Sequence, residues 1–330
     1  MRHKTEPLNQ YYAYSPRLGA RAYSATHVGP MHQPAVAVVP QRKLATIITI
    51  VAVAVCGFVF LFGGGAKESA AVLNSVTESK QKQPEKVIPP PVDTTAMQAE
   101  IDKIIAANPK LQISVATVDI NADKQTFQGV DAPYIAASVS KVISAIYYLQ
   151  GVEKGKHTLD TKIGGSPAGP QIEKMITESD NQSWWNLNDY AGRPKITAYG
   201  ASIGLQKYDA NTNTILTADV ALLLKKLYKR ELLNEEHTAL LLSYMERANK
   251  KDFIAASVPT GVKVHHKAGW LDDRSHDAAI IDNGKNPYVL VIFTKGNKAT
   301  YTEAKSIAVF KPVTTATVNA FITSPKTTLP

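Results

Sequence analysis

Residues 136–150 read AASVSKVISAIYYLQ and place Ser138 and Lys141 at the start of an apolar, helix-like pattern. Positions i and i+3 share one face of a helix, so we expect the two side chains to lie together. A serine hydroxyl is a poor nucleophile at neutral pH and needs a base within hydrogen-bond reach. A lysine serves as that base when burial or a second cation lowers its pKa. The stretch therefore predicts a serine nucleophile with a lysine base; the simpler alternative is a helix-capping serine beside a surface lysine.

Two later motifs favour the catalytic alternative. Ser179-Asp180-Asn181 occurs once in the chain, 41 residues after Ser138, and Lys267-Ala268-Gly269 begins 88 residues after Ser179. The first of these also suits the N-cap of a helix. The second ends an alternating strand pattern and supplies the second cation that Lys141 needs. A glycine at the end of such a strand allows another backbone to approach closely.

The order Ser-x-x-Lys, Ser-Asp-Asn, Lys-x-Gly resembles the signature of class A β-lactamases and penicillin-binding serine hydrolases. The resemblance covers residues 95–330 and implies that Ser138 forms an acyl-enzyme with Lys141 as its base. It also implies that Ser179 relays a proton to the leaving nitrogen and that Lys267 helps to hold the substrate carboxylate. The backbone N–H groups of Ser138 and Trp270 would form the oxyanion hole. The implied substrate-binding residues are Asn181, Ala268, Gly269, Trp270 and Arg274.

The third motif departs from that signature at its middle position. Many relatives carry a hydroxyl there that binds the substrate carboxylate, whereas this chain has Ala268. The polar residues that could replace this contact are Arg274, Ser275 and His276. His265 and His266 are adjacent in the strand pattern and therefore face opposite sides, which argues against a shared metal ion.

A second departure concerns deacylation. Class A β-lactamases carry a glutamate in a loop that follows the Ser-Asp-Asn helices, and this glutamate activates the water that hydrolyses the acyl-enzyme. The corresponding segment here, 204–216, is short and contains Asp209 as its only acid. An aspartate side chain reaches less far than a glutamate. We therefore expect acylation at Ser138 followed by slow release.

The spacing of apolar residues predicts an α+β domain. The predicted helices are 97–107, 138–150, 170–177, 182–191, 195–202, 217–229, 235–248 and one within 302–323; the predicted strands are 112–120, 124–130, 262–269, 277–282 and 288–294. Pro312 is expected to kink or split the last helix. Together with the resemblance, this order implies an antiparallel sheet flanked by terminal helices, with an all-α half beside it.

Residues 44–63, LATIITIVAVAVCGFVFLFG, form an uncharged run. About 20 apolar residues in a helix span a hydrocarbon core of roughly 30 Å. Residues 1–43 carry six basic side chains and one acidic side chain, which by the positive-inside rule places them in the cytoplasm. We expect a signal anchor in a single-pass cell membrane protein whose catalytic domain lies outside the cytoplasm. The long basic region disfavours the alternative, a cleavable signal peptide.

The rest of the chain divides around this span. Residues 1–43 are predicted to be a disordered basic tail, 64–94 a polar linker that ends in polyproline, and 95–330 the hydrolase domain. The only cysteine, Cys56, lies inside the apolar run. No disulfide is therefore expected in the outer domain.

The composition of the chain argues against several classes of function. The net charge of +9 is not gathered into a nucleic-acid footprint, and no zinc-ligand spacing is present, so we expect no nucleic acid, metal or cofactor. The sequence predicts a membrane-anchored extracytoplasmic serine hydrolase, acylated by a β-lactam or related amide. Two alternatives stay open: a D,D-peptidase acting on peptidoglycan stem peptides, and a sensor that holds β-lactam or cell-wall peptide without turnover. A monomer is expected.

Overall fold

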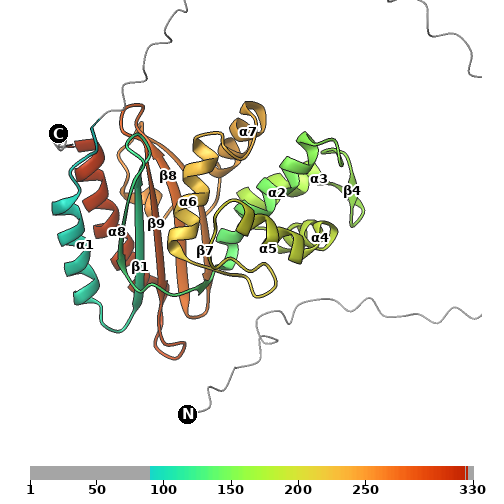
Figure 1. The fold of residues 1–330 in the computed structure, drawn as a ribbon. Coiled ribbons are helices and arrows are strands. Elements are labelled where there is room, and N and C mark those ends of the chain that lie inside the picture. Colours follow the sequence, from blue (N-terminus) through green and yellow to red (C-terminus); the bar gives the residue numbers. More distant parts are fainter. Residues whose placement is uncertain (1–89, 324, 326–330) are drawn as a thin grey trace, which may run out of the picture. The chain divides into compact units, whose positions relative to one another are not determined.

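The computed structural model describes residues 90–323 and residue 325 (Figure 1). The predicted tail 1–43 and membrane segment 44–63 lie outside the described residues, as does the predicted linker up to residue 89. Within the described range, none of the helices combines the length and the apolar character needed to cross a membrane. The anchor and the domain boundaries therefore stay predictions.

A five-stranded antiparallel sheet forms the centre of the domain (Figure 1). Its strands lie in the order β2 (Lys124–Gly129), β1 (Gln112–Asp119), β9 (Tyr288–Lys295), β8 (Arg274–Asp282) and β7 (Lys263–Leu271). Strand β9 is buried along nearly its whole length, as its unbroken apolar run predicts. Strand β7, which carries the third motif, forms one edge of the sheet.

Helices cover both faces of the sheet (Figure 1). The terminal helices α1 (Thr95–Ala107) and α8 (Glu303–Val318) pack together on one face, where Ile101 and Phe310 join an apolar cluster with residues of the sheet. Helix α6 (Thr217–Tyr228) packs against β1 and β9 from the other face. Apolar burial on both faces explains why the central strands lack the polar alternation of an exposed sheet.

The helical half begins with α2 (Lys141–Glu153), which is buried along most of its length. Helix α2 contacts α3 (Ala168–Thr177), α4 (Asn181–Ala191) and α5 (Arg193–Ser202), while α7 (Glu235–Glu246) packs against β7. Short strand pairs connect these helices: β3 (Tyr134–Ile135) with β6 (Thr214–Ile215), and β4 (Lys162–Ile163) with β5 (Ser166–Pro167). The 3-10 turns are η2 (Ala137–Ser140) and η3 (Ile254–Ser257).

The predicted α+β class and the order of helices and strands are confirmed for the described residues, with two corrections. The helix predicted at 138–150 begins only at Lys141, because Ala137–Ser140 form a 3-10 turn whose first residue, Ala137, has a left-handed φ of 50°. Pro312 does not split the last helix, because its neighbours Phe310 and Val313 are fully buried and hold the helix against the sheet.

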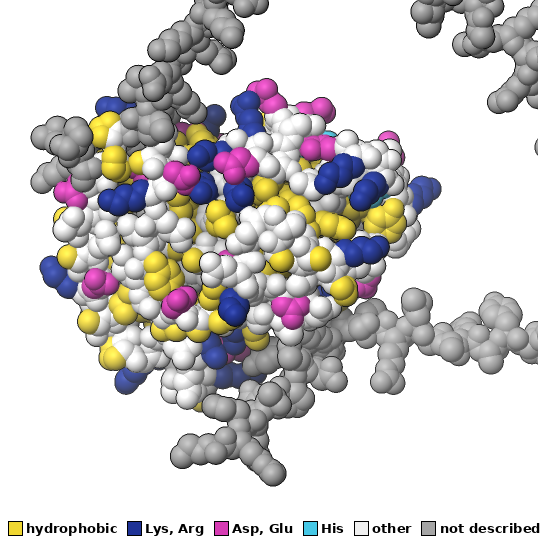
Figure 2. Space-filling view, in the orientation of Figure 1, with side chains coloured by type: hydrophobic (Ala, Val, Ile, Leu, Met, Phe, Trp, Pro, Cys, Tyr) yellow, Lys and Arg dark blue, Asp and Glu magenta, His cyan; other side chains and the backbone are white. Residues whose placement is uncertain are grey.

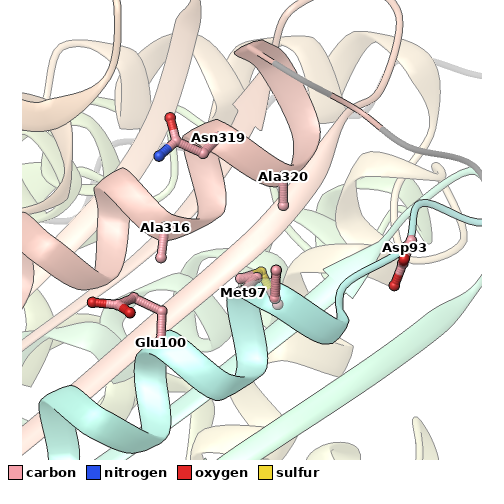
Figure 3. A pocket seen from close by; sticks show the side chains of 7 residues that line it. Asp93, Met97, Glu100, Ala316, Asn319 and Ala320 are labelled. Carbon is pink, nitrogen blue, oxygen red and sulfur yellow. The ribbon is translucent and has the colours of Figure 1, made fainter.

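Two surface features lie outside the predicted catalytic set. A hollow of about 280 Å³ opens between α1 and the π-helical turn η4 (Asn319–Thr323) that follows α8 (Figure 3). It is lined by Asp93, Ala96, Met97, Glu100, Ala316, Asn319 and Ala320. Basic and acidic side chains are interspersed on the face seen in Figure 2. Some of the surface charges form ion pairs, such as Lys225 with Asp123 at 2.6 Å. This interspersed pattern agrees with the scattered charge of the sequence.

Candidate active site

The predicted nucleophile Ser138 lies in the turn η2, where the sheet meets the helical half. Strand β7 runs directly against this turn: a Cβ atom added to Gly269 would lie 2.6 Å from the Ser138 nitrogen and 3.1 Å from the Ala136 oxygen. A side chain at position 269 would therefore push strand and turn apart. The glycine of the third motif thus brings the strand against the nucleophile, with Trp270 next in the chain.

Lys141 is the first residue of α2 and is only 1% exposed. Its Nζ lies 3.0 Å from Ser138 Oγ, 2.5 Å from the carbonyl oxygen of Ser179 and 2.7 Å from Asn181 Oδ1. Carbonyl and amide oxygens only accept hydrogen bonds. A neutral amine has two N–H groups and one lone pair, so donation to both oxygens leaves the lone pair facing the Ser138 hydroxyl. This geometry suits transfer of the serine proton to Lys141.

The surroundings of Lys141 favour its neutral form. The pKa of Lys141 falls to about 7, mainly because the amine is buried. The nearby charge of Lys267 lowers this pKa further, and the charge of Asp180 partly opposes the shift. An unperturbed lysine has a pKa of about 10.4. At neutral pH a substantial share of the Lys141 amines is therefore unprotonated, as a general base requires.

The three residues of the second motif have separate contacts. Ser179 has a left-handed φ of 60°, its hydroxyl accepts a hydrogen bond from Lys267 Nζ, and its carbonyl accepts one from Lys141 Nζ. Asp180 caps α4 by accepting from the Ser183 nitrogen at 2.8 Å. The motif is thus a helix cap and a part of the lysine site at once. Left-handed backbone at a residue other than glycine is strained, and such strain often occurs at functional sites.

Lys267 is fully buried in β7. Besides Ser179 Oγ, its Nζ donates to the carbonyl oxygen of Ala268 at 3.0 Å. Burial lowers the pKa of Lys267 to about 8, and the charge of Asp277 on the neighbouring strand opposes this shift. Ser179 therefore lies between two lysines whose pKa values are close to neutral, in position to relay a proton.

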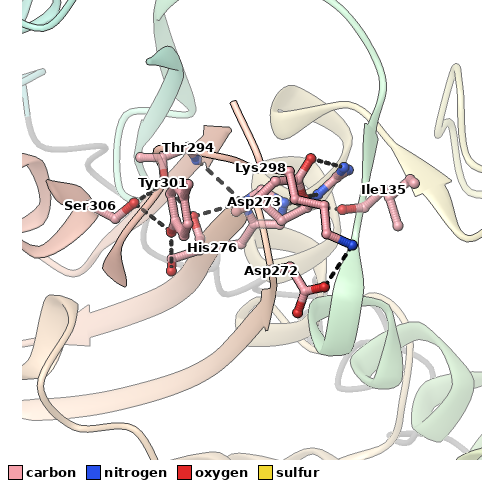
Figure 4. A network of polar contacts seen from close by, with 10 residues as sticks. Ile135, Asp272, Asp273, His276, Thr294, Lys298, Tyr301 and Ser306 are labelled. Carbon is pink, nitrogen blue, oxygen red and sulfur yellow. Dashed lines mark hydrogen bonds and ion pairs between the residues drawn. The ribbon is translucent and has the colours of Figure 1, made fainter. Parts of the chain in front are cut away.

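Two of the three residues considered as replacements for the missing hydroxyl, Ser275 and His276, have other hydrogen-bond partners; Figure 4 shows His276 with its partners. The Ala268 side chain itself belongs to the apolar cluster beneath α8. Ser275 Oγ lies 2.5 Å from the Tyr301 hydroxyl, and fully buried His276 lies 3.0 Å from the Ile135 carbonyl oxygen. Both side chains therefore already have hydrogen-bond partners within the domain, and the residue that replaces the hydroxyl stays a prediction.

Arg274 is the remaining candidate. It is 4% exposed, and its guanidinium forms a bidentate pair with Asp273 at 2.6 Å and 2.8 Å. A guanidinium has five N–H donors, so this pair leaves donors for a second anion. The Trp270 side chain is 38% exposed, and Lys250 Nζ lies 5.1 Å from the centre of its ring. The substrate-binding roles of Arg274 and Trp270 stay predictions.

The loop 204–216 uses its acid internally. Asp209 accepts hydrogen bonds from the Asn211 nitrogen at 2.8 Å and from Thr212 Oγ1 at 3.0 Å. Burial acts to raise the pKa of Asp209, but these hydrogen bonds outweigh it and lower the pKa overall. A carboxylate held in this way is a weak base. Asp209 therefore stabilises its own turn.

Two residues outside the motifs also belong to the site. Asn213 Nδ2 donates to the carbonyl oxygen of Ala137 at 3.1 Å, and buried Asp277 opposes the pKa shift of Lys267. Nothing in the sequence around Asn213 marks it, since its partner lies 76 residues earlier. Asp277 carried a weak signal, an acid at the start of an apolar strand. Among the described residues, no group of His, Cys, Asp and Glu side chains could hold a metal ion.

A match to a protein family shows to which family the chain belongs. A family model described as the β-lactamase enzyme family matches residues 96–321. The chain belongs to the β-lactamase enzyme family. It is thus a member of the serine β-lactamase and penicillin-binding superfamily, and the lysine–serine cluster described above lies within the matched range. No curated protein sequence matches the chain.

Solved structures of β-lactamases and of a penicillin-binding protein share the fold. A β-lactamase from Xanthomonas campestris pv. campestris is 21% identical, with a TM-score of 0.61 over 68% of this chain and 97% of that one. PBP-A is 22% identical, with a TM-score of 0.63 over 71% of this chain and 98% of its own. A PBP-A mutant in an acyl-enzyme complex with penicillin G is 21% identical, with a TM-score of 0.62 over 68% and 96%. At these identities the likeness shows the fold alone.

Proposed function

We propose that this β-lactamase family member is a serine hydrolase that is acylated on Ser138 by β-lactams or related amides and releases the acyl group slowly. The observation that carries the proposal is the contact of Lys141 Nζ with Ser138 Oγ at 3.0 Å, made by a buried amine whose pKa is about 7. A base of matched pKa within hydrogen-bond reach is what activation of a serine requires.

Acylation follows from the contacts of the cluster. Lys141 takes the hydroxyl proton of Ser138 as Oγ attacks the carbonyl carbon, and the carbonyl oxygen becomes an oxyanion that faces the backbone N–H groups of Ser138 and Trp270. When the C–N bond breaks, Ser179 donates its hydroxyl proton to the leaving nitrogen and recovers a proton from Lys267. The product is an ester on Ser138, and Lys141 has kept the proton of the serine.

The proposed slow release of the acyl group follows from the contacts within segment 204–216. Hydrolysis of the ester needs a base that removes a proton from the attacking water. The only acid of segment 204–216 is Asp209, whose carboxylate is bonded to the turn that contains it. Lys141 is protonated after acylation and becomes a base again only when its proton has left. Deacylation is therefore the slower step.

A D,D-peptidase is the second candidate, and the same loop favours it. Transfer or hydrolysis of a cell-wall stem peptide begins with the same acylation and does not need a glutamate in the loop. PBP-A, which shares the fold, forms an acyl-enzyme with penicillin G as a mutant. Release of D-alanine from a stem peptide, faster than release of penicilloate from penicillin, would favour the peptidase.

The experiment uses the full-length protein with a fluorescent penicillin. We expect labelling at Ser138, with a label that outlasts removal of the free drug. Absence of labelling would reject the acyl-enzyme. Labelling with no release from either substrate would favour the non-turnover sensor.

We also propose that residues 44–63 anchor the protein in the membrane with the hydrolase domain outside. The support is the uncharged run and its basic flank. The protein should stay in the membrane fraction through a carbonate wash, and protease added outside the cell should digest the domain. A soluble, N-terminally shortened protein as the sole product would contradict the anchor.

A further inference from the structure

The turn that carries the nucleophile is held by side chains from outside the three motifs. The Asn213 side chain donates from Nδ2 to the carbonyl oxygen of Ala137 at 3.1 Å, and the backbone carbonyl of Asn213 accepts from the Ala136 nitrogen at 2.8 Å. One residue of the loop therefore holds both residues that precede Ser138. The pairing of β3 with β6 lies directly next to these contacts and brings loop and turn together.

The local conformation of Asn213 suits this contact. Its φ is 53°, in the left-handed region that asparagine tolerates better than most residues. The residue is 6% exposed, and its Oδ1 is buried with no hydrogen-bond partner among the described residues. The side chain is thus fixed through Nδ2 alone, and the contact to Ala137 is its main polar role.

A second side chain holds the preceding residue from the sheet (Figure 4). His276 Nε2 lies 3.0 Å from the carbonyl oxygen of Ile135, and the Thr294 nitrogen lies 3.3 Å from Nδ1. Burial is the main cause that lowers the pKa of His276 to about 3, so the ring is neutral. The tautomer with its proton on Nε2 donates to Ile135 and accepts from Thr294 at Nδ1, which also lies 2.9 Å from the Ser275 carbonyl oxygen. Three successive residues before Ser138 are therefore tied to other elements.

These hydrogen bonds hold a strained backbone conformation at Ala137. Ala137 has a φ of 50°, a left-handed conformation that is unfavourable for a residue other than glycine. The Ala137 carbonyl also accepts from Ser140 Oγ at 3.2 Å, but that bond lies within the turn itself. Loss of the Asn213 bond removes the hydrogen bond that ties this carbonyl to the loop, so the turn can relax away from its left-handed conformation. Relaxation would move Ser138 Oγ relative to Lys141, and misplacement of a reacting group by about 1 Å can cost roughly a hundredfold in rate.

We propose that Asn213 is a positioning residue for acylation: its side chain holds Ala137 in the left-handed conformation that directs Ser138 Oγ toward Lys141. The inference rests on the proposed acylation of Ser138. It assigns to the short loop a role in forming the acyl-enzyme, separate from the activation of water that such a loop performs in class A β-lactamases.

The test is Asn213→Gly in the full-length protein, because glycine keeps the left-handed backbone and removes only the side chain. Stopped-flow labelling with a fluorescent penicillin separates the non-covalent dissociation constant from the acylation rate constant. We expect the rate constant to fall by about 10- to 100-fold with the dissociation constant nearly unchanged. The matched control is Arg230→Gly, at an exposed residue with a φ of 59° that pairs with Glu235; it should acylate like the wild type.

A second variant covers the case in which Asn213→Gly does not fold. Asn213→Asp keeps the shape of the side chain but places a carboxylate oxygen against the Ala137 carbonyl, so both groups are acceptors. It should show the same loss in the acylation rate constant. Wild-type rate constants in whichever of these variants folds would overturn the inference, as would a loss confined to the dissociation constant.

Hydrogen exchange separates failure of this inference from failure of the proposed function. A wild-type protein that no penicillin labels would reject the proposed function. The amides of residues 136–141 should still exchange faster in Asn213→Gly than in Arg230→Gly if Asn213 holds the turn. Equal exchange in the two variants would overturn the positioning role without any reference to acylation.

Discussion

The lysine–serine cluster (Ser138, Lys141, Ser179 and Lys267) and the loop 204–216 differ in what their reactive groups contact. In the cluster, each amine contacts a serine hydroxyl and both lysine pKa values are lowered toward neutrality. In the loop, the carboxylate of Asp209 is bonded to the backbone and side chains of its own turn. The contacts of the cluster support the proposed formation of an acyl ester, whereas the only acid of the loop, Asp209, is used in its own turn.

Removal of the nucleophile should have the largest effect. Ser138→Ala leaves Lys141 in place but removes the only atom that forms the ester, so covalent labelling by a fluorescent penicillin should disappear. Gel fluorescence measures the loss, and thermal unfolding checks that the fold is retained. Ser243→Ala, on the exposed side of α7, is the control and should label normally. A label that persists in Ser138→Ala would show that the cluster is not where acylation occurs.

Removal of the base comes next. Lys141→Met keeps a long side chain but no amine, and the acylation rate constant should fall by about 10²- to 10⁴-fold. Single-turnover labelling measures this rate constant. Lys154→Met, at the exposed end of the same helix, should leave it unchanged. A loss of less than tenfold would mean that another group activates Ser138.

The pH dependence of acylation distinguishes the roles of the two lysines. Lys141 must lose a proton to act, so acylation should rise as pH increases through about 7. Lys267 must keep its proton, so acylation should fall as pH increases through about 8. The charge of Lys267 lowers the pKa of Lys141; Lys267→Met should therefore move the rising limb to higher pH. If the rising limb of the pH profile does not move in Lys267→Met, the charge of Lys267 does not lower the pKa of Lys141.

The smallest effect is expected in the loop. Asp209→Asn should change the rate of release from the acyl-enzyme by less than about threefold, since a residue that is not the base contributes none of the usual 10²- to 10⁴-fold factor. Release is followed as loss of label after unbound drug is removed. A much slower release in this variant would place Asp209 in the deacylation step.

Much of this arrangement could be predicted from the sequence because it is local. Helical spacing placed Lys141 beside Ser138, and strand alternation placed Lys267 and Ala268 on opposite faces of β7, with Ala268 in the apolar cluster. Order along the chain then predicted that the motifs meet, and Ser179 does lie between the two lysines. Local periodicity and motif order are both properties that a single sequence carries.

The remaining features depend on contacts between distant segments. The hydrogen bond from Asn213 to Ala137 joins a loop to a turn, and no period in the sequence links them. The bidentate pair of Arg274 with the adjacent Asp273 depends on the short hairpin between β7 and β8. The 3-10 turn before α2 likewise depends on tertiary restraint, because the apolar pattern around Ser138 suits a continuous helix.

The central claim is that acylation is fast relative to release. The most direct test is intact-protein mass spectrometry of the full-length protein after a short exposure to excess penicillin G. We expect complete conversion to an adduct of the mass of the intact drug, which persists after the drug is removed, with turnover well below the roughly 10 s⁻¹ median for enzymes. Rapid return of the unmodified mass, with many equivalents of penicillin hydrolysed per protein, would contradict it.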